Sequence, residues 1–501
     1  MNADLLVHGG LVLPSADAPA RPADVLIHQG RIQALGAPGA FAGAVVARTL
    51  DATDRLLIPG LVNGHTHAHG ALGRGAVPDV ALEGFLAASP AINGQRALDD
   101  LALSATLTAV ELLKKGCTAA YDMCGEWPAP SLAGLHAVAG AYASVGLRAV
   151  VAPMLADRTL YQALPELLAA LPADLQPRLA ALQAPGPAAQ LALLDDAARH
   201  WPFDADQVRL GIAPTIPLHC SDGFLQACAA LAAAHGLPLQ THLAESAAQA
   251  ALGPQRYGHS LVAQLAALGW PAMLQGRWSV AHAIWITDAD IATLAQAGAT
   301  AVHNPLSNLR LGSGVAPVQR MRAQGLAVGL GSDGANTSDT QNLFEAARLA
   351  VGLSRLVGSD ESQWLSPADG LRMATEHSAR VLGWAGQIGR IAAGYQADLV
   401  LLDLAQPVYV PLRDALRQLV LGENGAAVDR VLVGGRLVVD GGRVLTVDEA
   451  ALRRRAQAAA ERLDVRNAEG RHLAALLRPG VSAWCCGMGG AGLHLARKLA
   501  G

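Results

Sequence analysis

The feature that most constrains the fold is a long alternation of strand-like and helix-like segments through the middle of the chain. Most of the short apolar runs are separated by amphipathic stretches, such as 97–115 and 221–235. The runs number eight and cover residues 56–62, 117–122, 147–153, 208–214, 238–243, 278–282, 300–304 and 327–331. Eight such repeats predict an α/β fold with a (β/α)₈ TIM-like barrel. A doubly wound sheet is the competing fold, but no glycine-rich phosphate loop follows an early strand.

Both ends of the chain are β-rich instead. Residues 1–58 alternate around glycines in short strand-like runs, and a similar pattern returns over 386–447. We expect these two stretches to pair into one small, discontinuous β-sandwich domain. Residues 59–385 between them would form the barrel as the catalytic domain. An Arg- and Ala-rich segment then begins a C-terminal helical extension, 448–501.

Composition excludes several classes of function. The formal net charge of −4 gives no basic footprint for nucleic acid. The first residues, MNADLLVHGG, do not resemble a signal peptide, and no apolar stretch is long enough to span a membrane. The six cysteines form no C-x-x-C pair. We therefore expect a cytoplasmic protein with reduced thiols and with no membrane or nucleic-acid partner.

Histidines and acidic residues stand where the strand-like runs end, and barrel enzymes carry their chemistry at the carboxyl ends of the strands. His65 and His67 follow the first run, and alternation along a strand points both to the same side. The polar residues at later strand ends are His242 and Glu245, His282, and Asp333. Three imidazoles and one carboxylate suit Zn²⁺ with an open position for water, and also Fe²⁺ or Mn²⁺.

Four segments together resemble the amidohydrolase superfamily: PGLVNGHTHAHGALGRG, THLAES, HNPLSNLRLGSG and GLGSDGANTSD. The branch that they resemble most contains the cytosine/guanine deaminase-like aminohydrolases and the triazine hydrolases. The resemblance covers about residues 5–447 and does not reach the last fifty. It implies that one divalent metal, expected to be Zn²⁺, is held by His65, His67, His242 and Asp333.

The resemblance also implies that Glu245 and His282 handle protons around the water bound to the metal. The chemistry of the residues agrees with these roles. Asp333 can take a proton from the water, because a metal lowers the pKa of bound water toward about 7. Glu245 is placed to protonate a ring nitrogen of the substrate, and His282 to orient the nucleophile. Two-metal members of the superfamily use a bridging lysine on strand four; here the matching segment, RLGIAPTIPLH, has none, so we expect one metal.

Three further residues are candidate substrate contacts: His69, His219 and Asn304. Relatives that deaminate nucleosides carry a PHAP run at the end of strand four, but this chain has Thr215 in place of its histidine. They also carry a Trp-Pro-x-Glu segment after strand one, which is missing here. Both differences favour a free base, a pterin or a triazine-like ring over an adenosine-type substrate. The long segment 154–207 is expected to add a loop over the barrel mouth.

The favoured function is hydrolytic deamination of an amino-substituted aromatic N-heterocycle of guanine, pterin, cytosine or triazine type. An alternative keeps the site but changes the leaving group, giving a chlorohydrolase or N-alkylaminohydrolase of triazine-like rings, or a cyclic amide hydrolase. A more remote alternative is a non-catalytic, zinc-stabilised binding protein. The partner is a small-molecule heterocycle, and we expect a homodimer.

Overall fold

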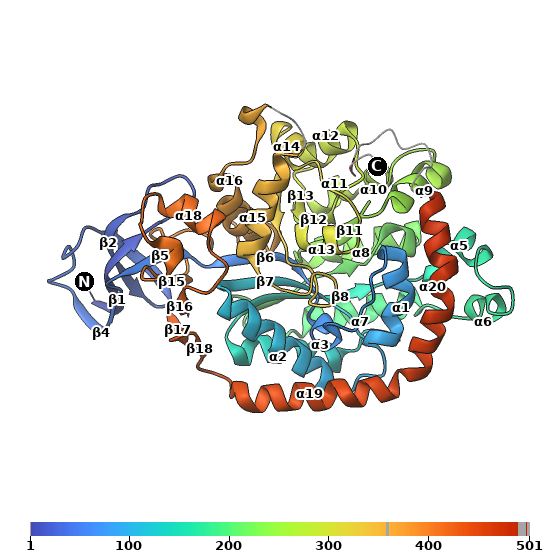
Figure 1. Cartoon of the computed structure of the whole chain (residues 1–501), viewed down its shortest axis with the longest axis horizontal. Helices are drawn as coiled ribbons and strands as arrows, with labels where there is room; N and C mark the ends of the chain where they lie inside the picture. The colour runs from blue at the N-terminus through green and yellow to red at the C-terminus, as the bar shows by residue number, and fades with distance from the viewer. Residues whose placement is uncertain (1, 357–359, 489–496, 498–501) are drawn as a thin grey trace.

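The two ends of the chain meet in one mixed sheet of nine strands, which stands at one end of the molecule (Figure 1). We analysed a computed structural model, which describes residues 2–356, 360–488 and 497. The order of the sheet is β18-β17-β16-β15-β5-β1-β2-β3, with β4 paired to β1. The strands are β1 (Asn2–Val12), β2 (Arg21–His28), β3 (Arg31–Gly36), β4 (Val45–Asp51), β5 (Arg55–Pro59), β15 (Leu399–Asp403), β16 (Val428–Val433), β17 (Arg436–Asp440) and β18 (Arg443–Val444).

Alternating apolar residues hold this terminal sheet together. Val25 and Ile27 of β2 pack with Leu399 and Leu401 of β15 in one buried cluster, although about three quarters of the chain separates them in sequence. A buried ion pair then ties the sheet to the rest of the molecule. The guanidinium of Arg148 donates to the Asp398 carboxylate through Nε at 2.8 Å and Nη2 at 3.2 Å.

The apolar run 56–62 is two strands rather than the single strand that its pattern predicts. β5 pairs with β15 in the terminal sheet, and β6 (Leu61–Thr66) pairs with β7 in the central part. Gly60 stands between them, where a Cβ atom would lie 2.1 Å from Oγ1 of Thr118. Only glycine allows this close approach, so the chain changes sheets at this residue.

The central strands are parallel and carry most of the helices around them, which confirms the α/β class. The strands are β6, β7 (Cys117–Cys124), β8 (Arg148–Leu155), β9 (Val208–Leu210), β10 (Ala213–Pro214), β11 (Leu239–Leu243), β12 (Trp278–His282), β13 (Thr300–His303) and β14 (Ala327–Leu330). The principal helices are α1 (Leu82–Asn93), α2 (Leu98–Lys114), α3 (Leu132–Val145), α7 (Pro187–Arg199), α8 (Asp222–His235), α9 (Ala247–Tyr257), α12 (Asp288–Gln296), α14 (Val318–Ala323) and α15 (Leu343–Ser354).

Strand pairing does not run unbroken around the ring that a barrel requires. One sheet contains β6 to β10 and the other contains β11 to β14. On one side they are joined by an isolated bridge between Ile212 and Leu239 and by a hydrogen bond from the amide of His242 to the carbonyl of Thr215 at 2.9 Å. On the other side, the amide of Asp333 donates to the carbonyl of His65 at 3.0 Å. Both seams lie beside residues expected to form the active site.

The long segment after β8 forms short helices away from the terminal sheet, at the right of Figure 1. They are α4 (Leu160–Ala163), α5 (Pro165–Ala169) and α6 (Gln176–Ala180), and the longer α7 follows them. Serine and threonine side chains cap the first turns of several helices through hydrogen bonds to backbone amides three residues later. Thr159, for example, accepts a hydrogen bond from the amide of Gln162 at 3.2 Å. We refer to residues 154–207 as the insertion.

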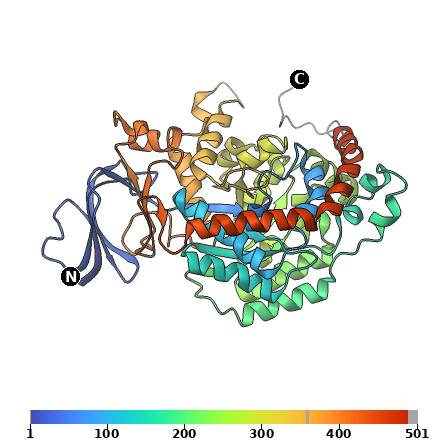
Figure 2. The same cartoon turned by 60° about the horizontal axis from the view of Figure 1, so that its bottom comes forward.

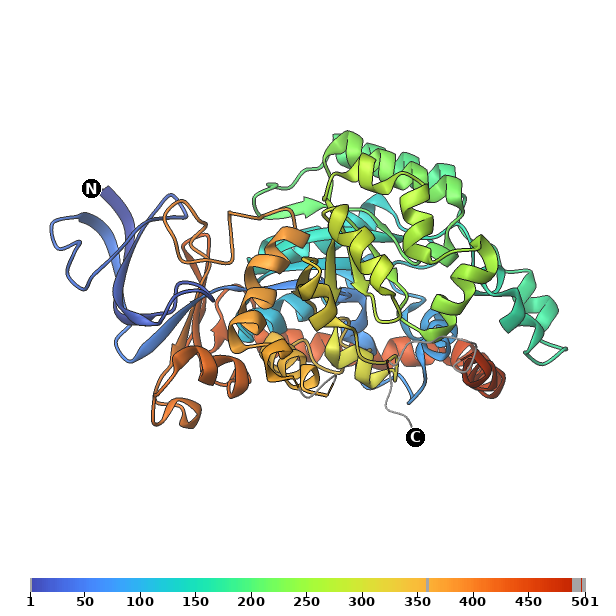
Figure 3. The ribbon, with the colours of Figure 1, turned by 90° about the horizontal axis from the view of Figure 1, so that it is seen from above.

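The C-terminal part of the chain adds two long helices to the outside. α19 (Glu449–Arg466) crosses the front of the molecule in Figure 2, and α20 (Ala468–Met488) turns away from it beside α1 and the insertion. Viewed from above, the terminal sheet and α20 lie at opposite ends of the molecule (Figure 3). Residues 489–496 and 498–501 of the predicted extension lie outside the described part. None of the described helices is long and apolar enough to cross a membrane.

Candidate metal centre and active-site cavity

Strand ends from both central sheets bring the predicted metal ligands together. His65 is the next-to-last residue of β6, His242 lies in β11, and Asp333 lies three residues beyond β14. The nearest ligand atoms of His65, His67 and Asp333 all lie within 4.8 Å of one another. His67 Nε2 lies 3.4 Å from Asp333 Oδ1 and 3.1 Å from His242 Nε2. The four residues therefore lie around one small volume.

The hydrogen bonds of the three rings fix which nitrogen carries the proton. Nδ1 of His67 donates to the carbonyl oxygen of Met123 at 2.7 Å, and Nδ1 of His242 donates to that of Thr215 at 2.6 Å. Nδ1 of His65 donates to Oε1 of Gln240 at 2.7 Å. Nε2 of Gln240 donates to the carbonyl of Gly64 and to the hydroxyl of Ser279, and these two bonds fix the orientation of the Gln240 side-chain amide.

In a neutral imidazole, a protonated Nδ1 leaves Nε2 with a free lone pair. Burial, followed by the neighbouring His67, lowers the pKa of His65 to about 3, so this ring stays neutral. Nε2 of His65 is buried and has no hydrogen-bond partner among the described residues. Nε2 of His67 lies 3.1 Å from Nε2 of His242, and both rings already donate through Nδ1. Lone pairs that converge in this way suit a cation, so the donor set fits a divalent metal.

Asp333 supplies the negative charge of the cluster. Burial alone would raise its pKa, but His67 and His65 hold the pKa below the ordinary value, so the carboxyl is ionised. Its backbone has a φ of +61°, and that of His282 has +69°. Residues other than glycine adopt this left-handed region at a cost, and the surrounding structure must hold them there. Both strained residues point polar groups at the same centre.

Glu245 and His282 lie beside the cluster as a separate pair. His282 Nε2 is 3.5 Å from Glu245 Oε2 and 3.8 Å from Asp333 Oδ2, while its Nδ1 donates to Asn308 Oδ1 at 2.8 Å. Burial, and then the carboxylates of Asp333 and Glu83, raise the pKa of Glu245 well above its usual range. This shift favours the protonated form of the Glu245 carboxyl, which is the form that can act as an acid.

A cavity of about 650 Å³ opens over this cluster. His69 and His219, both predicted to contact substrate, are on its wall. Nδ1 of His69 accepts a hydrogen bond from the amide of Gly125 at 2.9 Å, so its Nε2 carries the proton. Asn304, the third predicted contact, does not belong to the described wall. Its amide lies behind His282, 3.4 Å from the ring nitrogens.

Sequence reasoning missed several residues of the site. Gln240 orients His65 from two residues before His242, on the same face of the same strand, and this spacing was a usable signal. Trp127, in the loop after β7, lines the cavity and contacts the ring of His69 with centroids 5.2 Å apart. Side chains of α20 also line the cavity. No local sequence pattern predicts that Trp127 or α20 lines the cavity, because both positions depend on the tertiary fold.

Comparisons with known proteins agree with this geometry. The model of the amidohydrolase family matches residues 56–438. A 5-methylthioadenosine/S-adenosylhomocysteine deaminase of Desulforudis audaxviator is 32% identical over 92% of this chain and 99% of its own. An 8-oxoguanine deaminase of Pseudomonas aeruginosa is 33% identical over 88% and 94%.

Solved structures give the same result. An adenosine deaminase from Xanthomonas campestris with bound zinc has a TM-score of 0.80 and 27% identity, over 93% of this chain and 99% of its own. The atrazine chlorohydrolase of Arthrobacter aurescens in complex with zinc also has a TM-score of 0.80, with 25% identity over 91% and 100%. The chain belongs to the amidohydrolase family. It is an aminohydrolase with a buried histidine-rich metal site, and it acts on C–N bonds.

Proposed function

We propose that the protein hydrolyses an exocyclic amino group from a purine-like aromatic N-heterocycle and releases ammonia. The observation that carries this proposal is the buried carboxyl of Glu245, which lies 3.5 Å from His282 Nε2 and beside the donor set of His65, His67, His242 and Asp333. A site that only stabilised the fold would close its coordination and need no such acid. The deaminases among the relatives support the same chemistry.

We propose one divalent metal, Zn²⁺, with Fe²⁺ or Mn²⁺ as alternatives. His65, His67, His242 and Asp333 would hold it. When bound, it supplies a Lewis acid that activates water at neutral pH. The chain has three lysines, Lys114, Lys115 and Lys498, and none lies on the strand-four segment that would carry a bridge to a second ion. The zinc in the two structural relatives supports the choice of ion.

The chain's own groups then move the protons. Asp333 accepts a proton from the attacking water, and Glu245 donates its proton to a ring nitrogen. The water oxygen bonds to the ring carbon that bears the amino group, and the C–N bond breaks. The amine takes the proton held by Asp333 and leaves as ammonia, and the hydroxyl proton of the intermediate returns to Glu245, so the ring keeps a carbonyl oxygen and both carboxyl groups are restored. His282, held by Asn308, orients the oxygen nucleophile. His69 and His219 contact the ring from the cavity wall.

A second function has its own support. The similarity to atrazine chlorohydrolase extends over most of the chain, and protonation of a ring nitrogen by Glu245 would equally assist departure of chloride or an alkylamine. A zinc-stabilised binding protein is a weaker alternative, because it leaves the buried acid without a role. Thr215, which replaces the histidine of nucleoside-deaminating relatives, still favours a ring without ribose.

We further propose that the two parallel sheets are halves of one (β/α)₈ barrel, as the bonds at both seams suggest. The division into a terminal β-domain at 1–58 and 386–447, a catalytic domain at 59–385 and an extension at 448–501 remains part of the same proposal. So does a homodimer, which sedimentation measurements can test.

Product analysis separates the functions. Zinc-loaded protein is incubated with guanine, 8-oxoguanine, cytosine, isoxanthopterin, methylthioadenosine and chloro- and aminotriazines, and ammonia, chloride and alkylamine are measured. We expect ammonia from at least one purine-like ring. Chloride or alkylamine without ammonia would favour the second function. No product from the metal-loaded protein across the panel would contradict both.

A further inference from the structure

The active-site cavity extends well beyond the metal centre. Its inner end is formed by His67, His242, Glu245 and Asp333. Its volume of about 650 Å³ lies within the range of ~300–1,000 Å³ typical of pockets that enclose a whole drug-sized ligand. A single bicyclic base placed against Glu245 would leave much of this space unfilled. The remaining part, which we call the outer chamber, therefore has room for a further group of the substrate.

Three segments that are distant in sequence build the outer chamber. They are α1, the insertion and α20, which lie close together at the right of Figure 1. Each presents apolar side chains to the cavity: Leu82, Phe85 and Leu86 from α1, Leu179 and Leu182 from the insertion, and Leu473, Ala474 and Leu477 from α20. These side chains make the wall of the outer chamber mainly apolar.

The polar groups around the outer chamber are largely engaged with the protein. Gln190 bonds through both amide atoms to the backbone of Ala156, with Nε2 donating at 3.0 Å and Oε1 accepting at 3.3 Å. Nδ2 of Asn467 donates to two backbone carbonyls. Arg178 of the insertion pairs with Glu469 of α20 at 3.0 Å. A ligand in this chamber would thus find apolar surface more readily than free hydrogen-bond partners.

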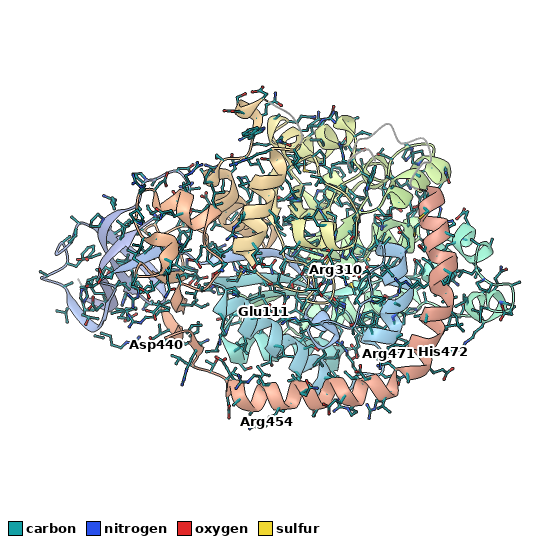
Figure 4. The ribbon with its side chains drawn as sticks, viewed as in Figure 1. Glu111, Arg310, Asp440, Arg454, Arg471 and His472 are labelled. Atoms are coloured by element: carbon teal, nitrogen blue, oxygen red, sulfur yellow. The ribbon has the colours of Figure 1, made fainter. Side chains whose placement is uncertain are left out.

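The position of α20 is fixed along its first three turns. Nη1 of Arg471 lies 2.6 Å from Asp464, which joins the start of α20 to the end of α19; Figure 4 labels Arg471 and His472 at this corner. Further along, Nη2 of Arg478 donates to the carbonyl of Asp79 at 2.9 Å. Leu477 and Val481 are 1% exposed. The helix is therefore a built wall of the cavity and not a loose appendage.

We propose that the substrate carries an extended apolar substituent on its heterocycle, that the outer chamber binds this substituent, and that α20 determines specificity for it. The inference rests on the proposed deamination, since it assigns the second half of the substrate for that same site. The reacting ring lies at the inner end, and an alkyl or aryl group of several carbons extends between α1, the insertion and α20. The product retains the substituent, because only the amino group leaves.

The test uses the ring that proves to be deaminated, substituted with methyl, ethyl, propyl and butyl groups at one position. Burial of each methylene is worth ~0.8 kcal/mol, so we expect kcat/KM to rise by about fourfold per methylene. The Leu473→Gln protein should lose much of this rise. Leu476→Gln is the matched control, because Leu476 is on the same helix but is 47% exposed and is not part of the described cavity wall. The control should keep the wild-type rise.

Calorimetry with the deaminated products of the same series gives a readout without turnover. Affinity should rise with chain length in the wild type and in Leu476→Gln, and should rise less in Leu473→Gln. If ammonia is released but neither kcat/KM nor affinity responds to chain length, the chamber proposal is wrong and the deaminase proposal stands. If no ring is deaminated, the deaminase proposal fails, and calorimetry with guanine that carries the same series of alkyl groups decides the chamber alone: a flat response overturns it.

Discussion

The two ends of the cavity are built in different ways. At the inner end, each ring of the proposed metal site has a defined hydrogen-bond partner, such as Gln240 for His65 and the Thr215 carbonyl for His242. At the outer end, apolar side chains from α1, the insertion and α20 form most of the wall that faces the cavity. Hydrogen bonds fix an angle and a proton position, whereas apolar contact only excludes water and sets volume. The inner end is therefore suited to chemistry and the outer end to choosing a substituent.

The origin of each end in the fold explains the difference. The inner residues follow parallel strands, whose carboxyl ends meet at one side of the sheets and hold side chains to within narrow limits. The outer residues come from segments added around these strands, which can change without disturbing the ligands. Substitutions at the inner end should thus change rates by orders of magnitude, and those at the outer end by small factors.

The largest effect is expected from removing a metal ligand. His242→Ala deletes one of the converging lone pairs and should abolish tight metal binding. Its loss of turnover should exceed the ~10²–10⁴-fold typical of one proton-transfer group. His200→Ala is the control, because this side chain is 73% exposed and pairs only with Asp196 among its described ion-pair partners. Metal analysis by mass spectrometry and ammonia release check both proteins. A His242→Ala protein with full metal and full activity would show that the donor set is assigned wrongly.

Glu245→Gln should separate chemistry from metal binding. The amide keeps the size of the side chain but cannot protonate a ring nitrogen, so we expect turnover to fall ~10²–10⁴-fold. Metal content should remain one equivalent per chain, because Glu245 lies outside the donor set. Turnover at the wild-type rate would refute the proton-donor role. Two equivalents of metal in the wild type would contradict the argument from the missing lysine.

The same contrast explains what the sequence predicts well. His65 and His67 were predictable because a strand places residues i and i+2 on one side, and the backbone at His67 is still extended, with φ of −133°. Asp333 and His282 were found as polar residues at strand ends, although their left-handed backbone leaves no sign in the sequence. Local periodicity thus identifies most of the inner end.

Features that depend on contacts between distant segments were not predictable in this way. The apolar run 56–62 looks continuous, and only the crowding of Gly60 against Thr118 reveals why it divides between two sheets. Asn304 follows β13 as expected, yet it lies behind His282 instead of on the cavity wall. Residues of α20 reach the cavity wall because α19 crosses the molecule and leads the chain there. The apolar positions of α20 alone could not predict this, because any packed helix has such positions.

A smaller effect is expected one step away from the metal. Gln240→Leu removes the acceptor for Nδ1 of His65, so the ring is free to rotate or to change its tautomer. Loss of such a partner typically costs ~10–100-fold in metal affinity or activity. Gln240→Glu restores an acceptor and should recover part of the loss. Competition with a chelator measures the affinity of all three proteins. Equal affinity in Gln240→Leu and wild type would mean that the ring is held by its packing alone.

The smallest effect is expected at the rim of the outer chamber, where Arg178 pairs with Glu469. Their side chains are 58% and 83% exposed, so water screens the pair, and its contribution should be ~0–1 kcal/mol. A double-mutant cycle with Arg178→Gln and Glu469→Gln isolates this coupling from other effects of each substitution. Denaturant unfolding gives the stability of the four proteins, and kcat/KM for the butyl-substituted ring gives the coupling in binding. If the outer chamber depends on apolar packing, both couplings should stay within this range. A coupling above about 2 kcal/mol would instead make the ion pair a principal constraint on the position of α20, and the contrast between a directional inner end and an apolar outer end would no longer hold.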